Sequence, residues 1–251
     1  MNANEISKAR KRVGINQSSY IPWRGYFDFI NSCDLFLIFD DVQYTNRDWR
    51  NRNRIKTPNG SQWLTVPVAH SRTDGTLVMN ANIVYNTDWI ADHEKWITIS
   101  LGKTLHFDEF FPEFRNILRQ NFETISQLNV ALIEWVCRTL EIRTPLQQSH
   151  LYAAEGKRGG RILDLLIKTE ATEYLSGPSA RAYLEPEQFR KLGIDLYFKS
   201  YDYLEYPQTH LPYDPAVTIL DLLCTVGQKA ARPLILSETP DEPAVQGAGI
   251  L

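Results

Sequence analysis

The chain of 251 residues has few cysteines and no segment of the kind that predicts a membrane or secreted protein. Its three cysteines, Cys33, Cys137 and Cys224, lie far apart in apolar surroundings and form no CxxC pair, which predicts buried, reduced thiols. No apolar run is long enough to span a bilayer, and the polar N-terminus lacks the hydrophobic core of a signal peptide. We therefore expect a cytoplasmic protein.

The short motifs of several enzyme classes are also missing. The five histidines show no zinc-binding spacing, no serine lies in a GxSxG motif, and glycines are too sparse for a P-loop or a dinucleotide fingerprint. Positive charge is not in excess, because the net charge is −3 and the pI is about 6.0, which argues against a general nucleic-acid or membrane-surface binder. We expect no metal site and no tightly bound cofactor.

Apolar runs and turn signals alternate along the chain in the order that predicts an α/β fold. Expected strands are 12–16, 35–39, 171–177 and 194–201, and a hairpin of 50–56 with 62–68 is expected around "TPNG". Expected helices are 25–34, 86–105 (capped by Asn86 or Thr87), one or two within 108–142, then 159–170, 185–193 and 214–227. The pattern predicts a mostly parallel, Rossmann-like sheet with an added hairpin and a helical insertion at about 87–142. A single catalytic α/β domain, 12–236, would lie between a polar arm, 1–11, and a disordered tail, 237–251.

Polar and aromatic residues follow three expected strands at their carboxyl ends, in 16–23, 40–44 and 174–184. Ligands of open α/β sheets bind outside such ends, although ordinary capped loops have a similar composition. Asp40 and Asp41 follow the second strand and could act as a general base, orient an amine, cap a turn or bind a metal. Adjacent acids in an extended segment point to opposite sides, which disfavours the metal.

The stretch "NRDWRNRNRIK" (46–56) concentrates positive charge in a slightly acidic chain. As a strand it would place its basic residues on one face: Arg50, Arg52, Arg54 and Lys56. The forked guanidinium groups suit phosphate, but a solvated edge strand carries the same pattern. We expect Asn51 to Arg54 to make the ligand contacts and Arg50 to face water.

Weaker signals lie elsewhere. "YLSGPSAR" (174–181) offers backbone N–H groups to an anion where a strand meets a helix start. His106 and His210 lie in aromatic-rich segments and are either bases or hydrogen-bonded structural groups. The aromatic residues of "PWRGYFDF" (22–29) form either a stacking wall or part of the core.

Five segments together resemble the WbqC-like protein family: "INQSSYIPWRGYFDFI", "FDDVQY", "NRNRIKTPNGSQWLTVPV", "TEYLSGPSARAYL" and "YPQTHLPYDPAVTILDLLCTVG". The resemblance covers roughly 12–230. Members occur among bacterial genes for surface polysaccharides, including O-antigen and lipopolysaccharide, notably those with acylated amino sugars. The family commonly has Ile-His-Gln-Pro at the first strand end, where this chain has Asn16 and Ser18 in place of His and Pro. If that His is a base, another residue must replace it here.

The resemblance implies a transferase that acts on a nucleotide-linked amino sugar, by moving an acyl, formyl or aminoacyl group onto the sugar amine. Asp40, Asp41, His106 or His210 would accept the amine proton. The expected substrate-binding residues are Asn16, Gln17, Tyr20, Trp23, Tyr26, Gln43, Tyr44, Arg47, Asn51, Arg52, Asn53, Arg54, Lys56, Ser176, Ser179, Arg181 and Gln208.

The partners that we expect are a nucleotide sugar and an acyl donor, with no membrane. The donor would be an acyl-CoA, a formyl-folate or an aminoacyl donor, and an aminoacyl-tRNA would be the one nucleic-acid partner. A glycosyltransferase that uses a nucleotide-sugar donor is one alternative. A non-catalytic nucleotide- or RNA-binding protein, in which Tyr44 and Trp49 stack on bases, is another.

Overall fold

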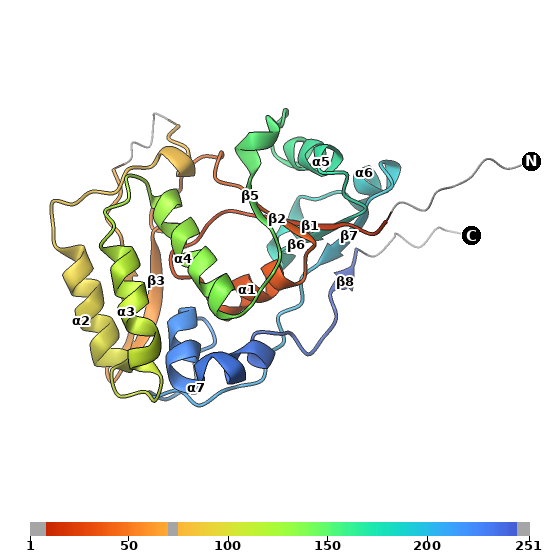
Figure 1. Ribbon diagram of the computed structural model, residues 1–251. Coiled ribbons are helices and arrows are strands. Elements are labelled where there is room, and N and C mark those ends of the chain that lie inside the picture. The colour runs from red at the N-terminus through yellow and green to blue at the C-terminus, as the bar shows by residue number, and fades with distance from the viewer. Residues whose placement is uncertain (1–8, 70–74, 245–251) are drawn as a thin grey trace, which may run out of the picture.

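The computed structural model describes residues 9–69 and 75–244 and forms an α/β fold around a six-stranded sheet, β5-β2-β1-β6-β7-β8 (Figure 1). The strands are β1 (Arg12–Asn16), β2 (Leu35–Ile38), β5 (Leu146–Gln148), β6 (Glu173–Ser176), β7 (Asp195–Phe198) and β8 (Glu242–Pro243). The first five are parallel, and β8 pairs antiparallel with β7. The mostly parallel sheet is therefore confirmed.

The strand order creates a switch point beside β1. The chain first builds outward from β1 to β2 and β5, then crosses to the other side of β1 and builds outward through β6 and β7. The loops after β1 and β6 therefore leave the sheet in opposite directions, and a crevice opens between them at the carboxyl ends.

Helices cover both faces of this sheet. The helix α1 (Arg24–Asn31) joins β1 to β2, whereas α5 (Gly159–Lys168) and α6 (Pro186–Lys191) lead into β6 and β7. Separate apolar clusters form on the two faces, with Phe29 and Phe36 in one and Val13 and Leu165 in the other. The sheet is thus buried on both sides, as expected of parallel strands with continuous apolar runs.

Gly14 in β1 lets α1 lie close to the sheet. A Cβ atom at this position would lie 2.7 Å from the Cys33 sulfur and 2.8 Å from a ring carbon of Phe36. Both distances are shorter than van der Waals contact, and a ring carbon of Phe29 in α1 lies only 3.1 Å away, so a larger residue would push α1 away from β1.

The predicted hairpin is confirmed, with shifted ends. It consists of β3 (Arg52–Thr57) and β4 (Gly60–Thr65), joined by Pro58 and Asn59. Gly60 has a φ of +104°, a conformation that favours glycine, which explains the strength of the "PNG" signal.

The helical insertion is also present, as α2 (Trp89–Leu101), α3 (Phe107–Leu118) and α4 (Ile125–Thr139). Figure 1 shows α2 and α3 far from α5 and α6, and α2 packs against β3. The predicted cap of the first helix is wrong, because Asp88 is the residue whose carboxylate accepts the Ala91 N–H, at 3.1 Å. Short 3₁₀ helices occupy Val78–Asn80, Ser149–Tyr152 and Pro178–Ala182.

The last helix, α7 (Ile219–Leu234), continues beyond its predicted end at Gly227. Gly227 has a φ of +76°, so the helix bends there and then resumes. The imidazole of His106 occupies the space that a Cβ of Gly227 would need, at 2.7 Å. Gly227 therefore allows α7 to kink around the His106 side chain and does not end the helix.

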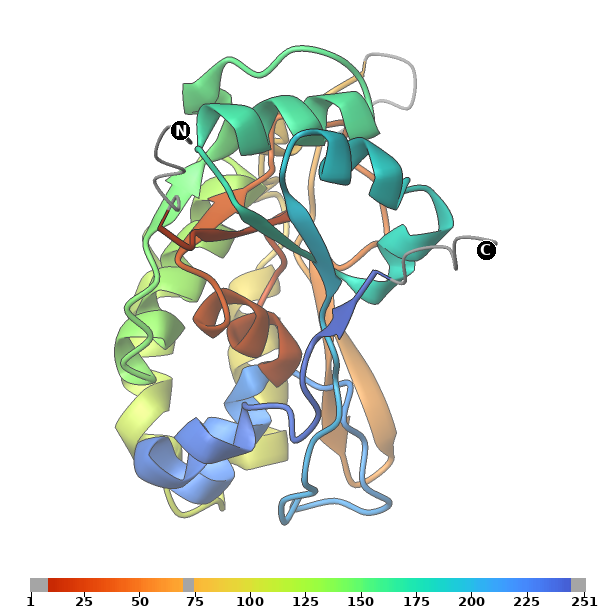
Figure 2. The same ribbon diagram turned by 90° about the vertical axis from the view of Figure 1, so that its right-hand side faces the viewer.

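The prediction of a disordered tail from 237 is wrong for 237–244. β8 lies along β7 at the sheet edge (Figure 2), and Asp241 is a counter-ion of two basic groups. Its carboxylate lies 3.0 Å from the Nζ of buried Lys199 and 3.0 Å from an Arg12 nitrogen. Composition alone predicts disorder here because the ion pairs depend on partners far away in the sequence. The remaining parts of the predicted arm and tail, 1–8 and 245–251, lie outside the described residues.

Within the described part of the chain, none of the helices has the length and apolarity to cross a membrane.

Candidate functional site

A cavity of about 450 Å³ lies at the switch point between β1 and β6, and we call it the switch-point crevice. Four separate segments line it: the end of β1 with the loop into α1, the loop before β3, the turn after β6, and the segment before α7. The lining residues are Asn16, Ser19, Pro22, Trp23, Tyr26, Trp49, Arg50, Asn53, Ser179 and Ala216. Five of them are among the substrate-binding residues predicted from the sequence: Asn16, Trp23, Tyr26, Asn53 and Ser179.

Aromatic rings form much of the crevice wall and continue outside it. Trp23 and Tyr26 lie inside, and Trp49 lies at the border with 42% of its surface exposed. The Trp49 ring centre is 5.6 Å from that of Trp63, which is 39% exposed, and the Arg52 guanidinium lies 4.1 Å from the Trp63 ring centre. Exposed rings next to a cavity offer stacking faces to a planar ligand.

Arg50 is the cationic residue of the crevice lining, and the expectation that it faces water is wrong. Its side chain is 17% exposed, because β3 begins at Arg52 and Arg50 lies in the loop before the strand. A terminal nitrogen of Arg50 lies 3.7 Å from the Asp48 carboxylate, and its Nε has no hydrogen-bond partner among the described residues. Burial tends to raise the pKa of Asp48, but Arg50 and the hydrogen bonds from Thr45 and Trp49 lower it overall. Arg50 therefore brings to the crevice a positive charge that is paired with Asp48 only at 3.7 Å.

The side chains of Arg52, Arg54 and Lys56 do not line the crevice with Arg50. Arg52 stacks on Trp63 outside the crevice, and Arg54 donates to the Ala216 carbonyl at 3.2 Å and lies 3.7 Å from Asp214. Lys56 is buried, with 4% of its surface exposed. The expected alternation therefore holds only from Arg52 to Ile55, where Asn53 and Ile55 are buried and the two arginines are partly exposed, and it ends at buried Lys56.

The loop between β1 and α1 is held in place by residues that were predicted to bind substrate. Asn53 donates from its Nδ2 to the carbonyls of Tyr20 (3.1 Å) and Ile21 (2.6 Å). The Tyr20 hydroxyl shares a hydrogen bond of 2.8 Å with the Nδ1 of buried His93. Ile21 has a φ of +41°, which a non-glycine residue keeps only when its surroundings fix it. Asn51 is likewise buried and donates to the Val66 carbonyl at 2.9 Å.

Asp40 and Asp41 point to opposite sides, as their adjacent positions predict. Asp40 accepts the Ser18 N–H at 2.8 Å and the Ser126 hydroxyl at 2.5 Å. Burial raises the pKa of Asp40, while both serines and Arg50 act in the opposite direction. Asp41 instead accepts the Ser149 hydroxyl at 2.5 Å and forms an ion pair with Arg161. Asp40 is thus buried behind the loop that lines the crevice, and Asp41 ties α5 to the end of β2.

Metal ligation finds no support in the described ranges, where no three His, Cys, Asp or Glu side chains gather around a common point.

The two predicted histidines lie away from the crevice. His106 contacts Glu109 at 3.0 Å and fills the kink at Gly227, and His210 shares a hydrogen bond of 3.2 Å with the Ser100 carbonyl. The remaining predicted residues are not in the lining either: Gln17, Gln43, Tyr44, Arg47, Ser176, Arg181 and Gln208. Of these, Arg181 pairs with Glu242, and Gln208 donates to the Asp214 carbonyl at 2.9 Å.

Sequence reasoning missed Ser19, Pro22 and Ala216 of the crevice, and it assigned Trp49 only to the nucleic-acid alternative. Ser19 and Pro22 stand inside the quoted "NQSSYIPW" loop, so a whole-loop assignment would have included them. Ala216 could not be identified from the sequence, because its methyl side chain has no group that indicates ligand binding.

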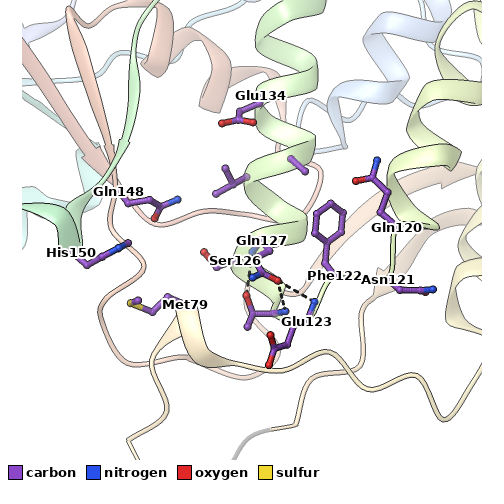
Figure 3. Close-up of a pocket in the computed structure, with 13 residues that line it drawn as sticks. Met79, Gln120, Asn121, Phe122, Glu123, Ser126, Gln127, Glu134, Gln148 and His150 are labelled. Atoms are coloured by element: carbon purple, nitrogen blue, oxygen red, sulfur yellow. Dashed lines mark hydrogen bonds between the residues drawn. The ribbon is translucent and has the colours of Figure 1, made fainter.

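A second cavity, of about 730 Å³, lies beside α4, and we call it the helix-α4 pocket. Figure 3 shows Gln148 and His150 on one side of α4, Gln120 and Phe122 on the other, and Glu134 further along the helix. The complete lining is Met79, Gln120, Asn121, Phe122, Glu123, Thr124, Ser126, Gln127, Val130, Ala131, Glu134, Gln148 and His150. The pocket adjoins Asp40, because Ser126 donates to the Asp40 carboxylate and the Met79 N–H donates to its carbonyl at 2.9 Å.

Known proteins resemble this chain over most of its length. The uncharacterized protein Rv1507c of Mycobacterium tuberculosis (strain ATCC 25618 / H37Rv) is 42% identical over 227 residues, which cover 88% of this chain and 96% of the relative. No solved structure matches. A model of the WbqC-like protein family matches residues 17–233, a range that contains four of the six strands of the sheet (β2, β5, β6 and β7) and the whole lining of both cavities except Asn16. The chain therefore belongs to the WbqC-like protein family.

Proposed function

We propose that this protein is a transferase that moves an acyl-type group onto the amine of a nucleotide-linked sugar, with the nucleotide bound in the switch-point crevice. The observation that carries the proposal is a partly buried arginine, Arg50, among aromatic rings at the switch point of a parallel sheet. Doubly wound sheets bind nucleotides at this position. Membership of the WbqC-like family agrees with a role in amino-sugar chemistry but does not specify it.

Each part of the crevice has a role in this proposal. The Arg50 guanidinium would donate to a phosphate, and a charge-assisted bond of this kind contributes about 1.5–3 kcal/mol. Asn16 uses its Oδ1 to accept the Gln17 N–H at 2.9 Å, which leaves its NH₂ group as a donor toward the ligand. The exposed face of Trp49 would stack on the nucleobase.

Asp40 is the base in the proposed reaction. The sugar amine forms a bond from its nitrogen to the acyl carbon, the bond between that carbon and its carrier breaks, and the carrier leaves with the bonding pair. The nitrogen loses one proton, which Asp40 accepts. Burial raises the Asp40 pKa, and a carboxylate with a raised pKa holds a proton more readily than an exposed one.

Binding of UDP and GDP, measured by calorimetry, tests the nucleotide site. Arg50→Gln should weaken the binding of whichever nucleotide the wild type binds by about 10- to 100-fold, as expected from the loss of one charge-assisted bond. Arg190→Gln is the matched control, since Arg190 is exposed, pairs with Glu187 and lies outside the crevice lining. Equal affinity of Arg50→Gln and wild type, or an equal loss in both variants, would refute the site.

The reaction itself is tested by incubating the protein with an amino-sugar nucleotide and each donor class. A mass gain on the intact nucleotide sugar is the expected result, and Asp40→Asn should abolish it. Release of free nucleotide without this gain would refute acyl transfer and favour a glycosyltransferase.

A further inference from the structure

We infer that the helix-α4 pocket binds the ammonium group of an amino-acid derivative, so that the transferred group is an aminoacyl group. The role of this ligand as the donor rests on the proposed function, whereas its binding rests on the pocket alone. The sequence predicts three classes of donor: an acyl-CoA, a formyl-folate and an aminoacyl donor. The residues that line the pocket favour one of them.

The charge of the lining disfavours an anionic transferred group or carrier inside the pocket itself. Glu123 and Glu134 line the pocket, and neither carboxylate has an ion-pair partner among residues 9–69 and 75–244. No Lys or Arg is among the thirteen lining residues. Acyl-CoA carries phosphates and formyl-folate carries carboxylates, and both would meet repulsion without a compensating cation. An ammonium group would instead pair with one of these exposed glutamates, which lie just before α4 and further along it.

The rest of the lining fits the body of an amino-acid derivative. Val130, Ala131 and Phe122 provide apolar surface, and Gln120 and Gln148 provide amide donors and acceptors for a carbonyl group. The volume of about 730 Å³ lies within the usual range for small-molecule sites. The pocket therefore offers room for a side chain as well as for the ammonium group.

The position of the pocket connects it to the proposed base. Ser126 lines the pocket and donates its hydroxyl to Asp40 at 2.5 Å, and the other oxygen of Asp40 accepts the Ser18 N–H beside the crevice residue Ser19. Asp40 lines neither cavity, but its two carboxylate oxygens connect a residue of the pocket lining to the loop that lines the crevice. In the proposed step the sugar nitrogen bonds to the aminoacyl carbon, the carrier leaves with the bonding pair, and the proton passes to Asp40.

The binding test uses L-phenylalaninamide, which carries an ammonium group and no carboxylate, in an NMR titration of the full chain. N-acetyl-L-phenylalaninamide has the same ring but no positive charge. The wild type should bind the first compound at least about 10-fold more tightly than the second, which corresponds to about 1.4 kcal/mol. The double variant Glu123→Gln, Glu134→Gln should remove this preference.

The control is Glu187→Gln, because Glu187 is an exposed acid that pairs with Arg190 far along the chain from the pocket. It should keep the wild-type preference. Equal binding of the two amides, no binding of either, or an unchanged preference in the double variant would overturn the inference.

UDP and GDP titrations of the same samples separate this inference from the proposed function. If phenylalaninamide binds as expected and neither nucleotide binds, the nucleotide site fails and the ammonium pocket stands. If a nucleotide binds through Arg50 and the amide does not, the aminoacyl inference fails and the nucleotide site stands.

Discussion

Buried His93 should make the stability of this protein depend on pH in mildly acidic solution. The imidazole lies between Tyr20 and Trp89, with ring centres 5.6 Å and 5.1 Å away. Burial lowers its pKa from 6.5 to about 4, and a hydrogen bond with the Thr65 backbone only partly opposes this. Replacement by Gln removes the titration while keeping a polar side chain.

The sign and size of the effect follow from proton binding. Between pH 6.5 and about 4 the unfolded chain binds a proton at this histidine and the folded chain does not, so the free energy of unfolding falls as the pH falls. The gap of about 2.5 pH units, at about 1.4 kcal/mol for each unit, gives a loss of about 3 kcal/mol by pH 4. Other groups that titrate in this range contribute equally to wild type and variant and cancel in the difference.

Urea unfolding followed by tryptophan fluorescence between about pH 7 and about pH 4 measures this loss. The wild type should lose about 3 kcal/mol more than His93→Gln over the range. His150→Gln, which removes an exposed imidazole, is the control and should match the wild type. If His93→Gln and wild type show the same pH dependence, His93 is not the buried neutral group described above.

Three further predictions concern packing, the crevice loop and the thiols. Gly14→Ala should destabilise the fold by about 1–3 kcal/mol through overpacking against α1. Gly159→Ala should not, because a Cβ atom at position 159 would meet nothing within 4 Å, and equal unfolding midpoints of the two variants would contradict this prediction. Asn53→Ala should cost about 1–3 kcal/mol, because the Tyr20 and Ile21 carbonyls lose a buried donor, while Asn59→Ala in the hairpin turn should change chemical denaturation little. Burial raises the pKa of Cys137 and Cys224 to about 12, so the thiols of the folded protein should react slowly with Ellman's reagent and those of the unfolded protein rapidly. A fast reaction of the folded protein would contradict their burial.

The sequence was sufficient for the features that depend on local chemistry. The apolar run of β2 predicts a buried parallel strand, "PNG" predicts the hairpin turn, and polar loops after β1 and β6 predict where the crevice lies. Each of these signals lies within a few neighbouring residues. The locations of the parallel strands and of the hairpin could therefore be predicted without coordinates, whereas the strand order that creates the switch point could not.

Features that depend on distant partners could not be predicted in this way. Asn53 has the composition of a ligand-binding residue, but its amide donates to a loop more than thirty positions earlier. Asp241 lies in a stretch whose composition predicts disorder, and it becomes ordered through Arg12 and Lys199. His106 fills a kink at Gly227. In each case the decisive partner is remote in sequence, and no local pattern identifies it.

The four-segment lining of the switch-point crevice has a consequence for synthesis of the protein. Asn16 emerges from the ribosome early, whereas Ala216 emerges only after most of the chain has been translated. A nascent chain that stops before this point can form β1 and α1 but lacks part of the crevice wall. A crevice ligand would therefore protect against proteolysis only those chains that have been translated and folded beyond Ala216.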